Sequence, residues 1–213
     1  MDTVDEFLRY LNNDELEVVK SALVSALIEK RVFHKFKFLG KSFTIAVDAT
    51  VVATYDRQYC TQCLSRTSKN GISTYLHSVL EAKLVTSNGF SISLATEWLQ
   101  NEQKSESFKK QDCELEAFKR LAEKIKKFFP RLPICIVADS LYPNNHFMEI
   151  CKQMNWDYIV TLKDGCLKAL QRVAAIKYLV GGVLEENKGS KNQKVIRRYR
   201  WINDLNHFTH PLH

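Results

Sequence analysis

The first regular pattern along the chain is helical. Four apolar residues recur every three or four positions behind the sequence NNDE, which has the polar residues of a helix cap: Leu16, Val19, Leu23 and Leu27. This spacing predicts a helix over residues 13–30. A stretch rich in basic and aromatic residues, KRVFHKFKFLGK, then leads into the first strand-like run.

Three runs in the next section have the composition of β-strands. They are FTIAVDATVV at 43–52, STYLHSVLEAKLV at 73–85 and FSISLATEWL at 90–99. The last two are separated by TSNG, which is a strong signal for a hairpin turn. The segment YDRQYCTQCLSRTSKNG, between the first and second runs, is interpreted as a loop that ends in a turn.

Helical and strand-like segments alternate in the second half of the chain. The pattern predicts a helix, a strand, a second helix and a second strand, at 107–129, 134–139, 144–155 and 157–163. A hairpin followed by such alternation predicts an α/β fold. We expect a mixed sheet flanked by helices, in the order of a ribonuclease H-like fold.

Composition changes this picture little. Hydrophobic residues make up 45% and charged residues 26% of the 213 residues, which is typical of a globular protein. No apolar run approaches the ~18 residues of a membrane span, and the N-terminus lacks the charge order of a signal peptide. We therefore expect a cytoplasmic protein with no membrane partner. The six cysteines are scattered, which favours reduced thiols over a disulfide framework.

A carboxylate lies within or directly after two of the apolar runs. Asp48 is in the middle of FTIAVDATVV, and Asp139 follows ICIVA. A carboxylate buried there costs several kcal/mol unless it is compensated by a cap, a salt bridge or a metal ion. The predicted sheet makes the two strands neighbours, so both acids would lie at one site. Mg²⁺ would offset their repulsion, whereas the simpler interpretation is that each aspartate caps a loop.

Several motifs together resemble the catalytic domain of DDE transposases of bacterial insertion sequences. They are IAVDAT, TYLHSVLEAKLV, ISLATEWL, KQDCELEAFKRL, FPRLPICIVADSLY and WDYIVTLKDG, and the match runs from about residue 2 to the C-terminus. The resemblance implies a metal-dependent enzyme that cleaves DNA and transfers its strands. Asp48 and Asp139 would be the first two catalytic acids and would bind Mg²⁺ or Mn²⁺. Ala49 departs from the family, in which glycine usually follows the first aspartate.

The same resemblance implies double-stranded DNA as the partner, both transposon ends and target, and allows for a homodimer in the DNA complex. The family's third acid is a glutamate on a late helix, beyond a β-rich insertion, and no late acid here lies in a convincing helix. We therefore expect that the chain ends inside that insertion. This gives an N-terminal helical and basic segment (1–42), a ribonuclease H-like core (43–180) and an incomplete insertion (181–213).

The expected insertion consists of a flexible stretch, GGVLEENKGSKNQK, and a strand, VIRRYRWINDL. If the strands that would pair with it are missing, VIRRYRWI is expected to be an unpaired edge in a loosely held tail. The core over 43–163 is expected to be well ordered. Efficient cleavage is not expected from a chain that has only two of three acids.

Glu114 is an alternative source of the third carboxylate. It lies four residues before Phe118 on the predicted helix, on the same face as the apolar stripe. Ribonuclease H enzymes place an active-site glutamate on the corresponding helix. The other interpretation is that Glu114 forms, with Asp112, an acidic first turn that the helix dipole stabilises. Glu97, at the end of its strand, is a weaker candidate of the same kind.

Basic residues provide candidate DNA contacts. The net charge of +7 and the pI of about 9.0 suit a polyanionic partner. Lys163 follows the strand DYIVTL and would lie at the same end of the sheet as the acids. The other candidates are in the late basic segment: Lys194, Arg197, Arg198 and Arg200. A solvated loop and a blunted edge strand are the alternative interpretation of that segment.

Two further interpretations stay open. Cys60 and Cys63 have the spacing of half a zinc site that His77 or Cys113 could complete, although the lack of a second pair favours two free thiols. The alternative function is that of a catalytically inactive transposase remnant that binds DNA non-specifically through a basic face. A small-molecule enzyme ranks last, because no glycine-rich phosphate loop is found.

Overall fold

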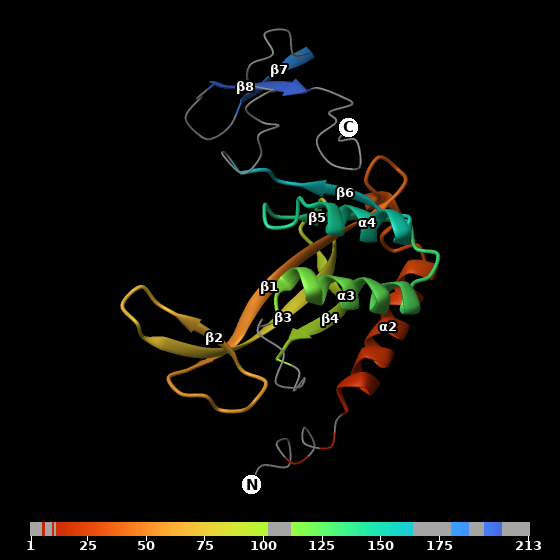
Figure 1. Cartoon of the computed structure of the whole chain (residues 1–213). Coiled ribbons are helices and arrows are strands. Elements are labelled where there is room, and N and C mark those ends of the chain that lie inside the picture. The colour runs from red at the N-terminus through yellow and green to blue at the C-terminus, as the bar shows by residue number, and fades with distance from the viewer. Residues whose placement is uncertain are drawn as a thin grey trace.

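A computed structural model of the chain describes residues 6, 10, 12–101, 112–163, 180–187 and 194–201. It has an α/β architecture, with a mixed open sheet flanked by helices (Figure 1). The strands of this sheet are β1 (Phe43–Tyr55), β2 (Leu64–Thr67), β3 (Ser73–Val85), β4 (Ser91–Leu99), β5 (Ile134–Ala138) and β6 (Asp157–Val160).

The sheet is built around β1. This strand pairs antiparallel with β3 on one side and parallel with β5 on the other, and β5 pairs parallel with β6. The outer edge of β3 is shared by β2 and β4, both antiparallel to it. The turn predicted at TSNG joins β3 to β4, with Gly89 at a φ of 84° that favours glycine.

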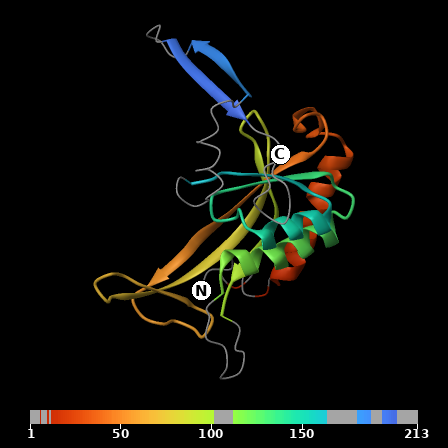
Figure 2. The same ribbon diagram turned by 45° about the horizontal axis from the view of Figure 1, so that its top comes forward.

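β5 covers only the first few residues of β1, from Phe43 to Ala46. The remainder of β1 continues with β3 and β2 as a narrow extension of the sheet, visible at the lower left of Figures 1 and 2. We call this extension, residues 50–78, the arm. A bulge between Val51 and Ala53 lies within it.

Three helices pack on the sheet: α2 (Asn13–Glu29), α3 (Glu114–Phe128) and α4 (Asn145–Met154), with a short 3₁₀ helix, η1 (His34–Phe36), before β1. α3 contacts β3 and β4 and lies side by side with α4, which contacts β6 (Figure 2). The core between helices and sheet includes Ile45, Leu80, Phe118, Leu121 and Ile125, all completely buried. The apolar stripe predicted on the helix at 107–129, which corresponds to α3, is therefore confirmed.

The position of α2 is confirmed, but the face expected from its spacing is wrong. Asn12 caps it by accepting a hydrogen bond from the backbone of Asp14, as the sequence NNDE indicates. Leu16, Val19 and Leu23 are 45%, 67% and 59% exposed. The buried side carries Ser21 and Val24 instead, and of the expected stripe Leu27 alone packs partly against the core. Lys20 of this helix bonds to Ser93 and Thr96 of β4.

Two segments interpreted as irregular contain strands. β2 lies inside the expected loop between the first two strands, because its residues pair with the first half of β3. At the C-terminal side, β7 (Val180–Asn187) occupies part of the segment expected to be flexible, and it pairs antiparallel with β8 (Lys194–Trp201). The prediction of a strand at VIRRYRWI is thus confirmed, whereas the expectation that this strand has no partner is wrong.

The remaining C-terminal residues and those at 102–111 lie outside the described residues, so the start of the helix predicted from 107 is seen only from Glu114. No helix in the described part of the chain is both long enough and apolar enough to cross a membrane.

Candidate active site

Asp48 lies on β1, and Asp139 directly follows the neighbouring strand β5 at the same level. The parallel register pairs Ala46 of β1 with Val137 of β5, and continuing it by two residues aligns the two aspartates. Neighbouring strands are ~5 Å apart, so the backbone of both acids belongs to one small region. This is the juxtaposition expected from the sequence.

The expectation that these carboxylates are buried is wrong. Both side chains are exposed, because Asp48 lies on the side of β1 opposite to Ile45 and Val47 and Asp139 lies just past the end of β5. Each also accepts a local hydrogen bond. Asp48 Oδ1 accepts one from the Ala49 amide at 3.0 Å, and Asp139 Oδ1 accepts one from the Leu141 amide at 2.8 Å. The remaining carboxylate oxygens face water, which supplies their solvation.

Glu114, the first residue of α3, lies in the electrostatic field of both aspartates. Burial raises the pKa of its carboxyl, a hydrogen bond from Tyr142 lowers it, and the charges of Asp139 and Asp48 raise it further, with a net increase. Tyr142 donates this bond to Glu114 Oε2 at 3.3 Å. The helix therefore brings a third carboxylate to the two on the sheet.

Tyr142 was not recognised in the sequence as part of this site. It is 1% exposed, and its ring packs edge-on against Phe118 and Phe147. Burial, followed by the charge and hydrogen bond of Glu114, raises the pKa of its phenol, so the hydroxyl stays protonated and can only donate to this carboxylate. The available signal was DSLY, which places an aromatic residue three positions after the second aspartate.

Ion pairs surround the beginning of α3. Arg120 bonds to Asp112 at 2.7 Å and to Glu97 at 2.8 Å, and Lys124 bonds to the second oxygen of Glu97 at 2.8 Å. Burial lowers and these two acids raise the pKa of Arg120, with a net increase that keeps it charged. Glu97 is thus neutralised by two cations, which favours a structural role for it.

Glu81 is a second acid beside Asp48 that the sequence did not single out. It is the direct cross-strand partner of Asp48 on β3, and it forms an ion pair with Lys83 at 3.0 Å. Cross-strand partners have Cβ atoms ~5 Å apart on the same face of the sheet. Lys83 therefore supplies a positive charge next to this pair of acids.

The predicted DNA-binding residues fall in two places. Lys163 is exposed and lies just past β6. It belongs to the same end of the sheet as Asp139, since the Thr161 amide bonds to Ala138 of β5. Those in the late basic segment all belong to β8, where their backbones pair with β7: Lys194, Arg197, Arg198 and Arg200. Their contacts with DNA stay a prediction.

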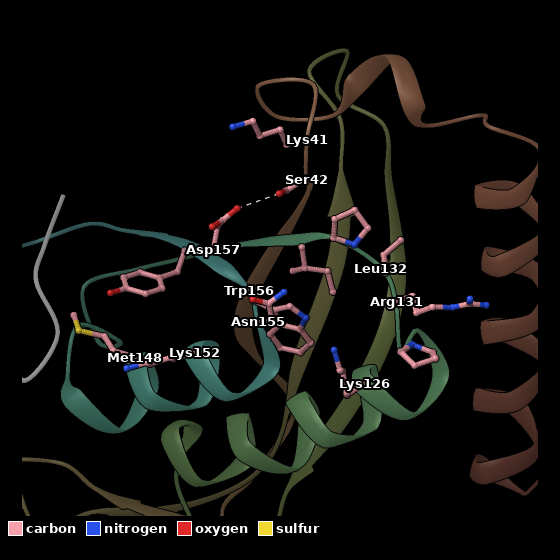
Figure 3. A pocket seen from close by; sticks show the side chains of 14 residues that line it. Lys41, Ser42, Lys126, Arg131, Leu132, Met148, Lys152, Asn155, Trp156 and Asp157 are labelled. Carbon is pink, nitrogen blue, oxygen red and sulfur yellow. Dashed lines mark hydrogen bonds between the residues drawn. The ribbon is translucent and has the colours of Figure 1, made fainter.

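A pocket lies at the opposite end of the strands from Asp139. It has a volume of about 660 Å³ and is lined by residues around the beginnings of β5 and β6 (Figure 3). Its charged side chains are mostly cations: Lys41, Lys126, Arg131 and Lys152, with Asp157 bonded to Ser42 at 3.1 Å. This pocket is basic and is distant from the carboxylates, so the two surfaces are separate candidates for binding.

One group of three potential metal ligands within 4.8 Å of one another occurs in the described residues, and it is not formed by the acids. It consists of Cys60, Cys63 and His77. The two cysteines and the histidine that spacing alone only weakly connected are therefore in contact. Asp48, Asp139 and Glu114 do not approach one another as closely as this.

No protein-family model matches the chain, and no curated protein is significantly similar to it.

Proposed function

We propose that this chain contains the catalytic domain of a DDE-type transposase with a ribonuclease H-like fold. The observation that carries the proposal is the position of Glu114 at the start of α3, where its carboxyl pKa is raised by burial and, to a smaller extent, by the charges of Asp139 and Asp48. Carboxylates from β1, from the residue after β5 and from α3 are then close enough to influence one another. The sequence motifs described above supply the connection with DNA transposition.

The strand arrangement supports this fold. β1, β5 and β6 are parallel, β3 is antiparallel between β1 and β4, and α3 connects the antiparallel part to the parallel part. This is the order expected for a ribonuclease H-like sheet, in which the first strand and the strand after the first long helix are neighbours.

The donor set suits Mg²⁺ or Mn²⁺. Asp48 and Asp139 offer exposed carboxylate oxygens, and Glu114 offers a third carboxylate, whose pKa is raised first by burial and then by the charges of Asp139 and Asp48. Hard divalent ions prefer such oxygen ligands and commonly share them with phosphate. When bound, the metal would supply activation of the attacking oxygen and stabilisation of the leaving oxygen.

The reaction proposed for this site is a phosphodiester exchange. In cleavage, an oxygen of water forms a bond to phosphorus as the bond to the 3′ oxygen breaks, which leaves a 3′ hydroxyl and a 5′ phosphate. In strand transfer, that 3′ hydroxyl attacks a target phosphodiester in the same way and releases a new 3′ hydroxyl. The proton of the attacking group passes to solvent or to a nearby carboxylate.

The residues of this chain position that reaction. The sheet fixes Asp48 and Asp139 at one level, and Tyr142 fixes the carboxylate of Glu114 by its hydrogen bond. Lys163 lies at the same end of the sheet as Asp139, where its charge can attract a DNA phosphate.

Metal titration of the full chain tests the proposal directly. We expect Mn²⁺ to bind the wild-type chain and to bind Asp48→Asn and Asp139→Asn at least ~10-fold more weakly, since each loses a charged oxygen ligand. Asp56→Asn is the matched control, because Asp56 is an exposed aspartate of the loop after β1. Calorimetry and the paramagnetic relaxation of water by Mn²⁺ both report this binding.

Equal affinity in the wild type and the two site variants would exclude the carboxylate metal site. Cleavage of end-labelled DNA is the second readout. Metal-dependent product that disappears in Glu114→Gln would mean that Glu114 acts as the third acid and that no later glutamate is needed.

The alternative function is a catalytically inactive relative that binds DNA through a basic face. The observation that favours it is the pocket at the other end of the sheet from Asp139, which is lined by Lys41, Lys126, Arg131 and Lys152. Such binding would weaken steeply with salt and yield no cleavage product at any metal concentration.

A further inference from the structure

The arm of the sheet carries a compact group of soft metal ligands. Cys60 and Cys63 lie in the loop between β1 and β2, and His77 lies on β3. The Sγ atoms of the cysteines are 3.5 Å apart, and His77 Nε2 is 3.6 Å from Cys60 Sγ and 3.5 Å from Cys63 Sγ. Three ligand atoms from two elements thus form a nearly equilateral triangle.

The edges of this triangle fit a tetrahedral zinc ion. Zinc–sulfur bonds of ~2.3 Å and zinc–nitrogen bonds of ~2.05 Å at tetrahedral angles place sulfur and nitrogen ~3.6 Å apart, and two sulfurs ~3.8 Å apart. The two distances to His77 agree with the first value. The sulfur–sulfur distance of 3.5 Å is shorter than the second by a few tenths of an ångström.

The surrounding residues hold the three ligands in place. The Cys63 amide bonds to the Cys60 carbonyl at 3.3 Å, which closes the turn, and Cys63 is 3% exposed. The ring of Tyr55 packs edge-on against His77. These contacts fix the ligands through packing and backbone bonds.

We propose that Cys60, Cys63 and His77 bind one Zn²⁺ that fastens the loop before β2 to strand β3. Two thiolates and an imidazole favour zinc over the hard ions suited to the carboxylate site. The described residues place no fourth protein ligand within the same 4.8 Å group, so the fourth position is taken by water or by a thiol that moves toward it.

Cys113 is the candidate thiol for that fourth ligand, because the residue before it is linked to the cysteine loop through Asn101. Asn101 donates to the Cys63 carbonyl at 3.0 Å, and its side-chain oxygen accepts a bond from the Asp112 amide at 3.3 Å. Cys113 follows directly and is half-buried at the start of α3. The zinc loop is therefore joined to the helix that begins with Glu114.

A disulfide is the competing chemistry for a Cys-x-x-Cys pair. Both cysteines are free thiols here, and their sulfurs are 3.5 Å apart against the ~2.05 Å of a disulfide bond. A disulfide would also leave the Nε2 of His77 without its two sulfur partners. The presence of the histidine at equal distance from both sulfurs is explained by a metal and not by oxidation.

The test uses the full chain, purified under reducing conditions without added chelator. We expect about one zinc per chain by elemental analysis, and a cobalt-substituted protein with the visible bands of a tetrahedral thiolate site. Cys60→Ser, Cys63→Ser and His77→Gln are each expected to lower zinc affinity by more than ~100-fold, beyond the effect of losing an outer-shell contact. His146→Ala, at an exposed histidine of α4, is the matched control and should retain the metal.

Chelation of the wild type avoids dependence on how well the variants fold. Removal of zinc should speed protease cleavage in the loop at 56–63, and added zinc should restore resistance. In Cys113→Ser, a loss of one sulfur-to-cobalt contribution would identify Cys113 as the fourth ligand, and an unchanged spectrum would assign that position to water. Purified wild type without zinc, with no cobalt bands, or with a Cys60–Cys63 disulfide in place of metal would overturn the proposal.

Discussion

Glu114 is the residue on which the charges of the candidate active site converge. Its carboxyl is half-buried, is bonded to the Tyr142 hydroxyl and faces the charges of Asp139 and Asp48. Its raised pKa means that the folded state holds the proton more tightly than the unfolded chain does. The stability from this proton is fully present below the unfolded pKa and is lost as the pH rises through the folded pKa.

We therefore expect Glu114→Gln to stabilise the metal-free protein at pH 7, by ~0.5 kcal/mol because solvent screens this partly exposed carboxylate. Glutamine keeps an oxygen for Tyr142 and removes the repulsion. The gain should vanish below about pH 4, where the carboxyl is protonated in both states. Urea unfolding of both proteins as a function of pH measures the difference.

Added Mn²⁺ should reverse that order at pH 7, since the metal stabilises the wild type through its extra carboxylate. Glu116→Gln is the control, because Glu116 is exposed and belongs to the same first turn of α3. A variant that is less stable than the wild type at pH 7 without metal would contradict the assignment of repulsion.

At this scale, a residue can be singled out from the sequence where it interrupts a strong pattern. Asp48 and Asp139 were singled out because each stands out against an apolar strand, and their role as metal ligands stays a prediction. Tyr142 and Glu81 were not found, because an aromatic residue in a turn and an acid in a half-exposed strand are ordinary in sequence. Their importance comes from partners that only the folded chain brings near.

Helix α2 shows how packing selects among faces at the scale of an element. Its sequence is apolar on more than one side, so helical spacing alone fits two different stripes. The structure buries Val24 completely and leaves Val19 67% exposed. The choice between the faces depends on contacts with residues distant in sequence, among them the bonds of Lys20 to Ser93 and Thr96.

These two valines give a matched pair of substitutions. Val24→Ala should destabilise the protein by ~2 kcal/mol, because it removes buried methyl groups and leaves a cavity. Val19→Ala should change stability by less than ~0.5 kcal/mol, because the side chain is exposed and alanine favours a helix. Thermal or urea unfolding of both variants measures this difference, and equal losses would mean that α2 packs through another face.

The strands missed in the sequence share a physical reason. β2 is four residues long, and β7 contains two glycines, which are poor strand formers. Each becomes a strand because a neighbouring strand pairs with it, β3 in one case and β8 in the other. Local propensity contains no information about that neighbour.

At the scale of the whole molecule, the candidate active site and the basic pocket lie at opposite ends of the strands of the sheet. Lys163 lies at the same end as Asp139, whereas Lys152 lines the basic pocket. A DNA that reaches the carboxylates would contact the first lysine, and a DNA held only by the basic face would contact the second. The two lysines therefore discriminate between the proposed function and its alternative.

We expect Lys163→Ala to reduce the slope of log binding constant against log salt by ~0.9, which corresponds to one phosphate contact. Lys152→Ala should leave the slope unchanged. Fluorescence anisotropy with a short duplex, from low to moderate salt, measures both. The opposite pattern would favour the inactive DNA-binding relative.

The position of β5 also sets the order of events during folding. β3 and β4 follow β1 closely in the chain, but β5 joins the other side of β1 only after β2, β3, β4 and α3. Parallel pairing between distant segments forms late, because a longer loop must close first. A refolding chain therefore regains much of its β-structure while Asp139 is still away from Asp48. Any chemistry that requires both carboxylates could begin only after β5 has paired with β1.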